Sequence, residues 1–447
     1  MGSSVAANLA SEANDITVVD VDRKLLLDLQ DRLDIRTVHG QASYPDVLLR
    51  AGAEDADMIL AVTNSDETNM IACQIAHSLF RTPTKVARIR SRHYIGFEKL
   101  FGNDAIPVDV MISPEQVIID DGQKWIAQPG TLQVLDFADG VVQLVAVKAY
   151  YGGPLVGQAL SLLPDHMPNV VTRVAAIFRK GTPIIPQGDT VIEADDEVFF
   201  IAARKDIRTV MGELRRLYRP NKRIIIAGGG NIGKGLAQAL ENDYSVKLID
   251  HNADRSKQIS EELDNTIVLH ADAADEELLL EENITSTDVF CAVTNDDEAN
   301  ILSCMLAKRL GARKVLALIN RASYVDLVES GDIDIAVSPH QAMIGSLLAH
   351  VRRGDVAAVH SLRRGAAEAI EAVAHGDSRS SKVVGRRIED IKLPPGANIG
   401  AIVRGTEVIM AHHDTVIEAE DHVILFLIDK RRVVEVEKLF QVGVTFL

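Results

Sequence analysis

Short apolar runs alternate with amphipathic stretches in the second half of the chain. Runs of about four to eight β-branched residues are typical of buried strands, and apolar residues at helical spacing are typical of helices. Strands are predicted at Lys222–Ala227, Ser245–Asp250, Thr266–His270, Asp288–Thr294 and Lys314–Ile319. Helices are predicted at Lys234–Glu241, Asp254–Leu263 and Glu298–Leu310. Because strands that alternate with helices form a parallel sheet covered on both faces, this segment is predicted to be a Rossmann-like α/β domain.

The pattern changes at about Val356, where short apolar segments are separated by turn residues. Examples are Ala401–Arg404, Glu407–Ala411 and His422–Ile428. This alternation predicts a small, β-rich α+β domain.

The chain contains the same pattern twice. DMILAVTNSDETNMIAC at Asp57–Cys73 and DVFCAVTNDDEANILSC at Asp288–Cys304 agree at 9 of 17 positions, with an offset of 231 residues. DTVIEADDEVFFIA at Asp189–Ala202 and DTVIEAEDHVILFL at Asp414–Leu427 agree at 8 of 14, with an offset of 225. Ordered matches at a nearly constant offset indicate tandem duplication. The prediction is an α/β chain of two Rossmann-like parallel-sheet domains (1–130 and 221–350), each followed by a small α+β domain (131–214 and 355–447), joined by the polar Arg215–Asn221.

Charge and cysteine content restrict the classes of function. The formal net charge is −17 without a long basic run, which argues against nucleic-acid binding because phosphate recognition needs a basic face. The longest apolar runs, such as Val423–Ile428, are far shorter than the roughly 20 residues that cross a bilayer. Cys73, Cys291 and Cys304 form no CxxC pair and are predicted to be reduced core residues rather than metal ligands.

A glycine-rich turn follows the first strand of the second half. Gly228, Gly230 and Gly233 spell GxGxxG, where they would permit a tight turn, let the backbone approach a pyrophosphate, and let the helix pack closely on the strand. The helix N-terminus would offer N–H groups to the phosphates. Asp250 ends the next strand 22 residues after Gly228, where an acid binds ribose hydroxyls and repels a 2′-phosphate. The motif and Asp250 together favour NAD(H) over NADP(H). ATP or ADP would fit the same loop and acid. The alternative is a glycine loop that binds no nucleotide.

Further polar residues lie at the predicted carboxyl edge of the same sheet, where ligands bind. Thr294 and Asn295 end the fourth strand and could reach a ribose or phosphate, but a helix cap explains them nearly as well. Asp272 follows the third strand at the same rim. We interpret His270 as a strand-end histidine with satisfied hydrogen bonds.

The first half repeats most of these features. Asp20 matches Asp250, and Thr63 and Asn64 match Thr294 and Asn295. Arg88 lies on the fifth strand, where its guanidinium could pair with a phosphate. The alternative is a solvated strand-end arginine, and the second half has Ala317 at the aligned position.

One departure from the repeat concerns the start of the chain. Gly2 aligns with Gly233, the last glycine of the motif, so the first strand and the first two glycines have no counterpart before it. We hypothesise that the natural start lies upstream, and that a GTG codon for the residue before Gly2, read as an initiator, would produce the present N-terminus. If the upstream reading frame contains no such segment, the first half is a degenerate site.

The repeated segments resemble a known family. AVTNSDETN at Ala61–Asn69 and AVTNDDEAN at Ala292–Asn300 are similar to the RCK/KTN nucleotide-binding domains that regulate potassium conductance. KAYYGGPLVG at Lys148–Gly157 and EAIEAVAHGD at Glu368–Asp377 resemble the small domains of its tandem members. The resemblance covers the whole chain except the segment missing before Gly2.

The resemblance implies a regulatory subunit at the cytoplasmic face of the inner membrane. It would bind NAD(H), and ATP or ADP as a further ligand, and gate a potassium-translocating integral membrane subunit as a homo-oligomeric dimer or tetramer ring. By motif, the family's contacts fall on Asp20, Thr63, Asn64, Arg88, Gly228, Gly229, Gly230, Asn231, Ile232, Asp250 and Thr294.

An NAD-dependent oxidoreductase is the alternative function. It would need a general acid or base facing the nicotinamide. His375, His412 and His413 have no matched partners in the other half, and a duplicated catalytic unit should duplicate its catalytic group. A transcription factor is disfavoured because no helix-turn-helix pattern or basic face is present.

Overall fold

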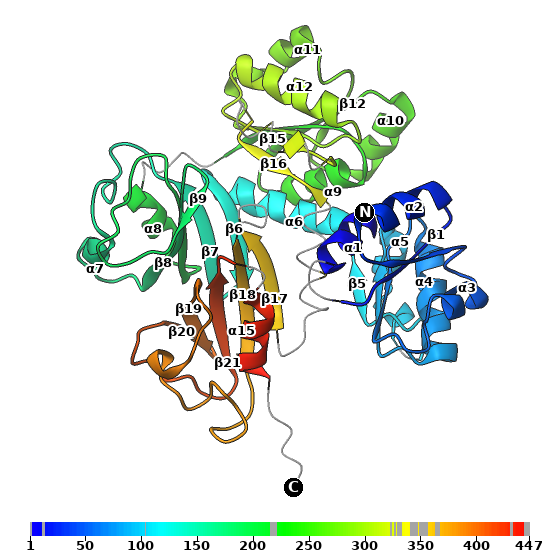
Figure 1. Cartoon of the computed structure of the whole chain (residues 1–447). Coiled ribbons are helices and arrows are strands. Elements are labelled where there is room, and N and C mark those ends of the chain that lie inside the picture. Colours follow the sequence, from blue (N-terminus) through cyan, green and yellow to red (C-terminus); the bar gives the residue numbers. More distant parts are fainter. Residues whose placement is uncertain are drawn as a thin grey trace. The chain divides into compact units, whose positions relative to one another are not determined.

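The chain divides into two compact units (Figure 1). The computed structural model describes residues 2–10, 14–102, 104–214, 221–321, 324–325, 328, 333–339, 347, 356–362, 367–429 and 432–441. One unit comprises residues 1–117 and 339–351, and the other comprises residues 118–338 and 352–447. Of the predicted joint, only Asn221 lies among the described residues; it is buried and donates a hydrogen bond to the carbonyl of Ile126 at 2.7 Å.

A six-stranded parallel sheet forms the core of the second Rossmann-like domain. Its strands are β11 (Arg223–Ala227), β12 (Ser245–Asp250), β13 (Ile267–His270), β14 (Val289–Ala292), β15 (Lys314–Leu318) and β16 (Ile335–Val337). The helices between them are α9 (Asn231–Leu240), α10 (Ala253–Glu262), α11 (Glu276–Glu281), η4 (Ile284–Ser286) and α12 (Asp297–Arg309). The predicted strands and helices are confirmed with shifts at their ends, whereas α11 and β16 are additional.

The strand order β13-β12-β11-β14-β15-β16 reverses between β12 and β14, on either side of β11. Helices α11 and α12 pack on one face of the sheet through Leu279, Cys304 and Ala307. A doubly wound sheet has its ligand crevice at the carboxyl ends of the strands where the order reverses. The fold therefore places that crevice at the glycine turn after β11.

The sheet of the first Rossmann-like domain is divided. β1 (Thr17–Asp20) pairs with β2 (Arg36–His39), while β3 (Met58–Ala61), β4 (Thr84–Arg88) and β5 (Val110–Ile112) form a separate sheet. Among the described residues, no strand lies between β1 and β3, the position of β11 in the other copy. Accordingly β3 is mostly half-buried, whereas its counterpart β14 is buried throughout.

Four helices of this domain follow the same order as α9, α10, α11 and α12 of the second: α1 (Gly2–Ala10), α2 (Arg23–Arg32), α3 (Pro45–Arg50) and α4 (Asp66–Ile75). The domain also contains η1 (Ala76–Phe80), α5 (Arg92–Ile95), η2 (Glu98–Leu100) and α6 (Pro114–Ala127). A Cβ atom added to Gly2 would lie 3.7 Å from Val62, and one added to Gly233 would lie 3.2 Å from Val293. These matching contacts support the alignment of Gly2 with Gly233, and of α1 with α9.

The two small domains have the same topology. The first is an antiparallel sheet of β6 (Thr131–Phe137), β7 (Val142–Lys148), β8 (Thr172–Arg179), β9 (Thr182–Ile184) and β10 (Glu197–Ala203), with η3 (Leu160–Leu162), α7 (Leu163–His166) and α8 (Ile207–Leu214). The second has β17 (Val356–Leu362), β18 (Ala367–Ala374), β19 (Ala397–Arg404), β20 (Glu407–Met410) and β21 (Asp421–Leu427), with η6 (Ile388–Asp390) and α15 (Val433–Phe440). Their strand orders, β6-β7-β10-β8-β9 and β17-β18-β21-β19-β20, correspond position by position, as the duplication predicts.

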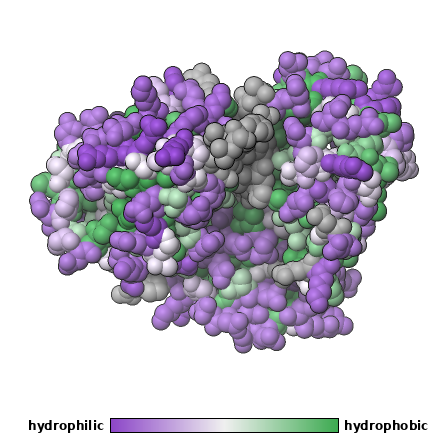
Figure 2. Space-filling view, turned by 90° about the horizontal axis from the view of Figure 1, so that it is seen from below, coloured by the Kyte–Doolittle hydropathy of each residue, from purple (hydrophilic) through white to green (hydrophobic). Residues whose placement is uncertain are grey.

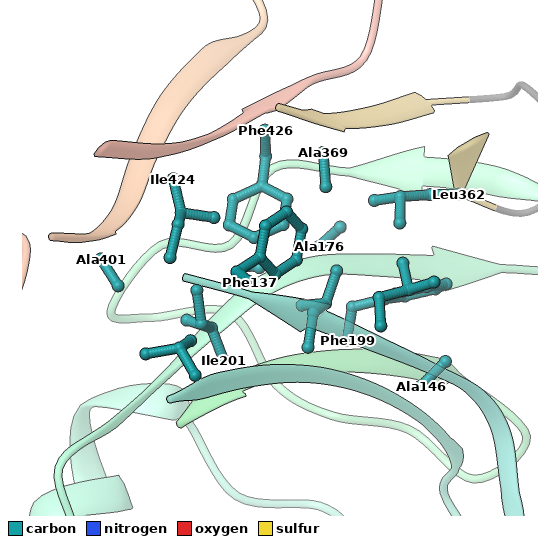
Figure 3. Packing of buried hydrophobic residues seen from close by; sticks show 14 of the residues in the cluster. Phe137, Ala146, Ala176, Phe199, Ile201, Leu362, Ala369, Ala401, Ile424 and Phe426 are labelled. Atoms are coloured by element: carbon teal, nitrogen blue, oxygen red, sulfur yellow. The ribbon is translucent and has the colours of Figure 1, made fainter. Parts of the chain in front are cut away.

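The two small domains pack against each other through one face of each sheet. Phe137, Phe199 and Ile201 of the first sheet share a buried cluster with Leu362 and Phe426 of the second (Figure 3). The opposite faces are covered by α8 in the first domain and α15 in the second. Strands β7, β10 and β21 are therefore apolar on both faces, because each face lies in a core.

Polar residues predominate on the face drawn in Figure 2, with smaller apolar patches between them. The described helices are too short or too polar to span a bilayer. Cys73, Cys291 and Cys304 are buried and unbridged, which confirms the prediction that they are core residues. Burial raises the pKa of Cys73 and of Cys291 to about 12, so both thiols are protonated at neutral pH.

Candidate functional site

The glycine turn after β11 is held by very close backbone contacts. Gly228 has φ +108°, a conformation that disfavours a side chain, and its N–H donates to the carbonyl of Ile249 at 2.8 Å. A Cβ atom on Gly233 would lie only 1.8 Å from the carbonyl oxygen of Gly228. The first and third glycines therefore allow the tight turn and the close helix–strand packing that the motif requires.

Gly230 differs from both of these glycines. A Cβ atom added there would meet nothing within 4 Å, and the residue is exposed directly before Asn231, the first residue of α9. The opening N–H groups of a helix have no partners within the helix and attract anions. Open space thus lies in front of a helix N-terminus, while Ile232 one residue further on is buried.

Asp250 is a buried acid beside this turn. Its carboxylate accepts hydrogen bonds from the N–H groups of Gly229 at 2.6 Å and Asn252 at 2.8 Å, and from Arg255 at 3.1 Å. Burial alone would raise the pKa of Asp250, but these hydrogen bonds and the Arg255 charge outweigh it and hold the pKa below its ordinary value. The acid is therefore ionised and fixed in orientation next to the glycine turn.

Asp20 occupies the corresponding position in the first half. It pairs with His39 across β1 and β2, as Asp250 pairs with His270, and it accepts a hydrogen bond from the N–H of Asp22 at 2.8 Å. Asp20 is half-buried rather than buried, because the described residues include no glycine turn beside it.

The threonines of the repeated AVTN segment are held by an asparagine that the sequence analysis did not single out. Asn300 Oδ1 accepts from the N–H of Thr294 at 2.9 Å and from its hydroxyl at 2.7 Å, and Asn300 Nδ2 donates to the carbonyl of Leu318 at 2.9 Å. Asn69 makes the same contacts with Thr63 and with the carbonyl of Arg88. The identity of both asparagines between the halves was the available signal.

A second residue of the repeat, an aspartate, is also structural. Asp66 accepts hydrogen bonds from the N–H groups of Arg90 and Ser91, and Asp297 accepts them from Asn320 and Arg321. Both carboxylates are buried, so each fixes the chain that leaves the next strand.

The helix after this segment is capped by Asp296 rather than by Thr294 or Asn295. The side chain of Asp296 accepts a hydrogen bond from the N–H of Ala299 and forms the N-cap of α12. The alternative that Thr294 and Asn295 cap this helix is therefore wrong. Asn295, like its counterpart Asn64, is exposed at the carboxyl edge of the sheet.

Arg88 points to a carboxylate within its own domain. Its Nη2 lies 3.0 Å from Oε1 of Glu115, and both side chains are largely buried, so it is not a solvated arginine. The aligned residue is also not Ala317: the shared contacts of Asn69 and Asn300 pair Arg88 with Leu318. The prediction placed Lys85 opposite Lys314, whereas the strand registers pair Met58 with Thr84 and Val289 with Lys314, so that Thr84 is the residue that aligns with Lys314.

His270 ends β13, an edge strand of the second sheet, and Asp272 follows two residues later. Asp272 is exposed and accepts a hydrogen bond from the N–H of Ala274 at 2.9 Å, and β12 separates β13 from the glycine turn. His270 Nε2 lies 3.1 Å from the carbonyl of His251, in keeping with a satisfied strand-end histidine. The structure therefore groups Gly228–Gly233, Asp250 and Thr294 at one edge, with Asp272 further away.

Comparison with known proteins identifies the family. The TrkA-N domain matches residues 1–114 and 224–339, and the TrkA-C domain matches residues 144–215 and 378–441. A Trk system potassium uptake protein TrkA from Halomonas elongata is 66% identical over 446 residues, which cover 100% of this chain and 98% of that protein. The chain belongs to the TrkA family. The TrkA protein of Haemophilus influenzae is 51% identical over 448 residues, covering 100% of this chain and 98% of its own length.

Solved structures of the GsuK channel and of its RCK domain show the same fold. The GsuK RCK domain superposes with a TM-score of 0.60 over 98% of this chain and 92% of that chain, at 18% identity. The GsuK channel bound to NAD gives a TM-score of 0.61 over 98% of this chain and 76% of that chain, also at 18% identity. The tandem RCK architecture expected from the sequence is therefore confirmed.

The histidines considered for an oxidoreductase lie away from the glycine turn in sequence and in domain. His375 Nδ1 pairs with Glu420 at 2.7 Å on the second small domain, where His412 and His413 are exposed. Within the described parts of the chain, no group of His, Cys, Asp and Glu side chains could hold a metal ion. The TrkA relatives are named for potassium uptake rather than for an enzymatic reaction.

Proposed function

We propose that this chain is a regulatory, NAD(H)-binding subunit of a potassium uptake system, and that it acts without catalysing a reaction. The observation that carries the proposal is the open space at Gly230, which precedes the first residue of α9 and follows Gly229, whose N–H donates to the fixed carboxylate of Asp250. A pyrophosphate suits the helix N-terminus, and ribose hydroxyls suit the carboxylate.

The ligand would be held by residues of the second Rossmann-like domain. Gly228, Gly229, Gly230, Asn231, Ile232 and Gly233 form the cradle, Asp250 binds the ribose, and Thr294 and Asp272 lie along the rim. ATP and ADP share the adenosine and phosphates and would compete for this cradle. In the first domain, Asp20, Thr63, Asn64 and Arg88 are the corresponding candidates, and Arg88 would have to exchange Glu115 for a phosphate.

Regulation would act through the conformation of an assembly. A ligand shifts an equilibrium only by binding one state more tightly than another. We propose a homo-oligomeric ring at the cytoplasmic face of the inner membrane, attached to an integral membrane subunit that translocates potassium. The TrkA relatives, named as Trk system potassium uptake proteins, support this partner and process.

The test uses Gly230→Leu, which should fold normally because the added side chain enters open space, yet should fill the phosphate position. Calorimetry is expected to show NADH binding to the unaltered chain and at least about tenfold weaker binding to Gly230→Leu. Gly188→Leu is the matched control, since its nearest neighbour is 3.9 Å away in the first small domain.

Cells lacking the gene should recover potassium uptake at low external potassium with the unaltered chain and Gly188→Leu, and show altered regulation with Gly230→Leu. Equal NADH affinity in all three chains would contradict the proposed site. Steady consumption of NADH with a carbonyl substrate would instead favour the oxidoreductase.

A further inference from the structure

Helix α6 belongs to both compact units of the chain. Its first turn, up to Val117, lies in the first unit, and the rest of the helix, from Ile118 onward, lies in the second. The helix runs without interruption over Pro114–Ala127. The chain also crosses between the units at 338–339 and 351–352, so a test of α6 has to interrupt this helix alone.

The first turn of α6 is anchored to the first Rossmann-like domain. Glu115 Oε1 lies 3.0 Å from Nη2 of Arg88, and the two side chains are 20% and 12% exposed. The carbonyl of Arg88 accepts a hydrogen bond from Asn69, which also holds Thr63. The anchor therefore ends at the residues that are the first-half candidates for binding a nucleotide.

The middle of α6 packs on α9 of the second Rossmann-like domain. A Cβ atom added to Gly122 would lie 3.4 Å from Leu236. The side-chain amide of Gln123 donates to the carbonyl of Ala239 at 3.4 Å. Because α9 begins directly after the second glycine of the turn, a ligand that orders α9 also acts on the helix packed against it.

The last turn of α6 is fixed to the same domain. The carbonyl of Ile126 accepts a hydrogen bond from Nδ2 of Asn221 at 2.7 Å, and Oδ1 of Asn221 accepts one from Arg313 at 2.5 Å. Nζ of Lys314 lies 5.3 Å from the centre of the Trp125 ring. Only the first turn of α6 is thus held outside the second unit.

We propose that α6 transmits the occupancy of the glycine-turn site to the first Rossmann-like domain. A nucleotide that orders α9 also orders α6 and, through Glu115, the segment that carries Arg88. This inference rests on the proposed function, because the ligand is the same. Coupling between sites needs an element whose states the ligand favours differently, and an unbroken helix attached at both ends meets that need.

The experiment measures amide hydrogen exchange by mass spectrometry on the full chain, with and without saturating NADH. Asp120 is exposed in the middle of α6. Asp120→Pro breaks the helix there, because proline lacks the N–H and clashes with the preceding turn, and Asp120→Gly weakens it. Asp120→Ala is the matched control, since it loses the same side chain and keeps the helix.

In the unaltered chain, NADH should slow exchange at the glycine turn. It should also slow exchange at residues 84–91, around Arg88, by about fivefold or more, the lower end of coupling between sites. Asp120→Ala should show both effects. Asp120→Pro should keep the first and lose the second, and Asp120→Gly should weaken the second. Gly230→Leu, which blocks the second-half site, should show neither.

Three results would overturn the inference. They are protection of the glycine turn without a change at residues 84–91, equal slowing at 84–91 in all three Asp120 variants, and slowing at 84–91 that persists in Gly230→Leu. If Asp120→Pro does not fold, equal slowing in Asp120→Gly and Asp120→Ala counts against α6. If NADH leaves the glycine turn of the unaltered chain unprotected, the proposed function itself fails.

Discussion

The carboxylate of Glu371 in the second small domain accepts a hydrogen bond from the backbone N–H of Ala138 in the first, at 2.9 Å. Ala138 has φ +48° in the β6–β7 turn, and Glu371 is buried and also pairs with His422. The first copy has Ala146 where the second has Glu371. Because only the second copy carries this carboxylate, the hydrogen bond distinguishes the two copies. It specifies that the sheet of the first small domain packs against the sheet of the second rather than against a like sheet.

Removing this carboxylate should weaken the packing of the small domains. Glu371→Ala leaves the Ala138 N–H buried without a partner, at a cost of about 1–3 kcal/mol. Urea unfolding can be followed by the fluorescence of the single tryptophan, Trp125, whose indole donates to the carbonyl of Thr131 at the start of β6. Glu420→Ala, which removes an exposed acid paired with His375, should shift the curve little. Equal shifts would contradict the role given to Glu371.

Acid should destabilise the same interface through His360. Burial lowers the pKa of His360 from 6.5 to about 4, and its Nε2 lies 3.2 Å from the carbonyl of Asp136. The unfolded chain therefore binds the proton more tightly than the folded chain, so stability is complete above about pH 6.5 and falls as the pH drops toward 4, by about 3 kcal/mol from this residue.

The matched variant for this prediction is His360→Leu, because the first copy has Leu135 at the corresponding register. Urea unfolding measured from pH 7 to pH 4 should show a smaller loss of stability in His360→Leu than in the unaltered chain. Parallel curves for the two chains would show that His360 is not responsible.

Substitution by alanine should destabilise the second Rossmann-like domain at Gly233 but not at Gly230. Gly233→Ala forces a methyl group to 1.8 Å from the Gly228 carbonyl oxygen, which should cost about 3 kcal/mol or more and disrupt the second Rossmann-like domain. Gly230→Ala should leave the thermal unfolding midpoint nearly unchanged, since its methyl group meets nothing within 4 Å. Differential scanning calorimetry of both variants provides the comparison, and similar midpoints would disprove the geometry.

The buried asparagine of the repeat should matter for both stability and binding. Asn300→Ala removes the acceptor of two Thr294 donors and the donor to Leu318, so unfolding should become easier by about 2–4 kcal/mol. NADH affinity should fall as well, because Thr294 is no longer fixed at the rim. Asn242→Ala, at an exposed position of the same domain, is the control for both measurements. If a folded Asn300→Ala chain binds NADH with unchanged affinity, Thr294 does not contribute to the binding site.

Local pattern predicted much of this molecule. The spacing of apolar residues identified the strands and helices of the second half, and matching segments established the duplication. The glycine turn and Asp250 could also be predicted from the sequence. The positive φ, the close backbone approach and the acid at the strand end are all required within one short segment of chain.

Tertiary contacts decided the rest. The salt bridge of Arg88 with Glu115, the hydrogen bond from Asn300 to the Leu318 carbonyl and the one-way bond from Ala138 to Glu371 each join residues whose proximity depends on how the sheets assemble. The sequence alone specified which segments are strands, helices and turns, since these follow from backbone geometry and local burial. Only the folded chain specified which polar groups meet, because a hydrogen-bond partner is chosen by spatial position and the chain pattern carries no signal for it.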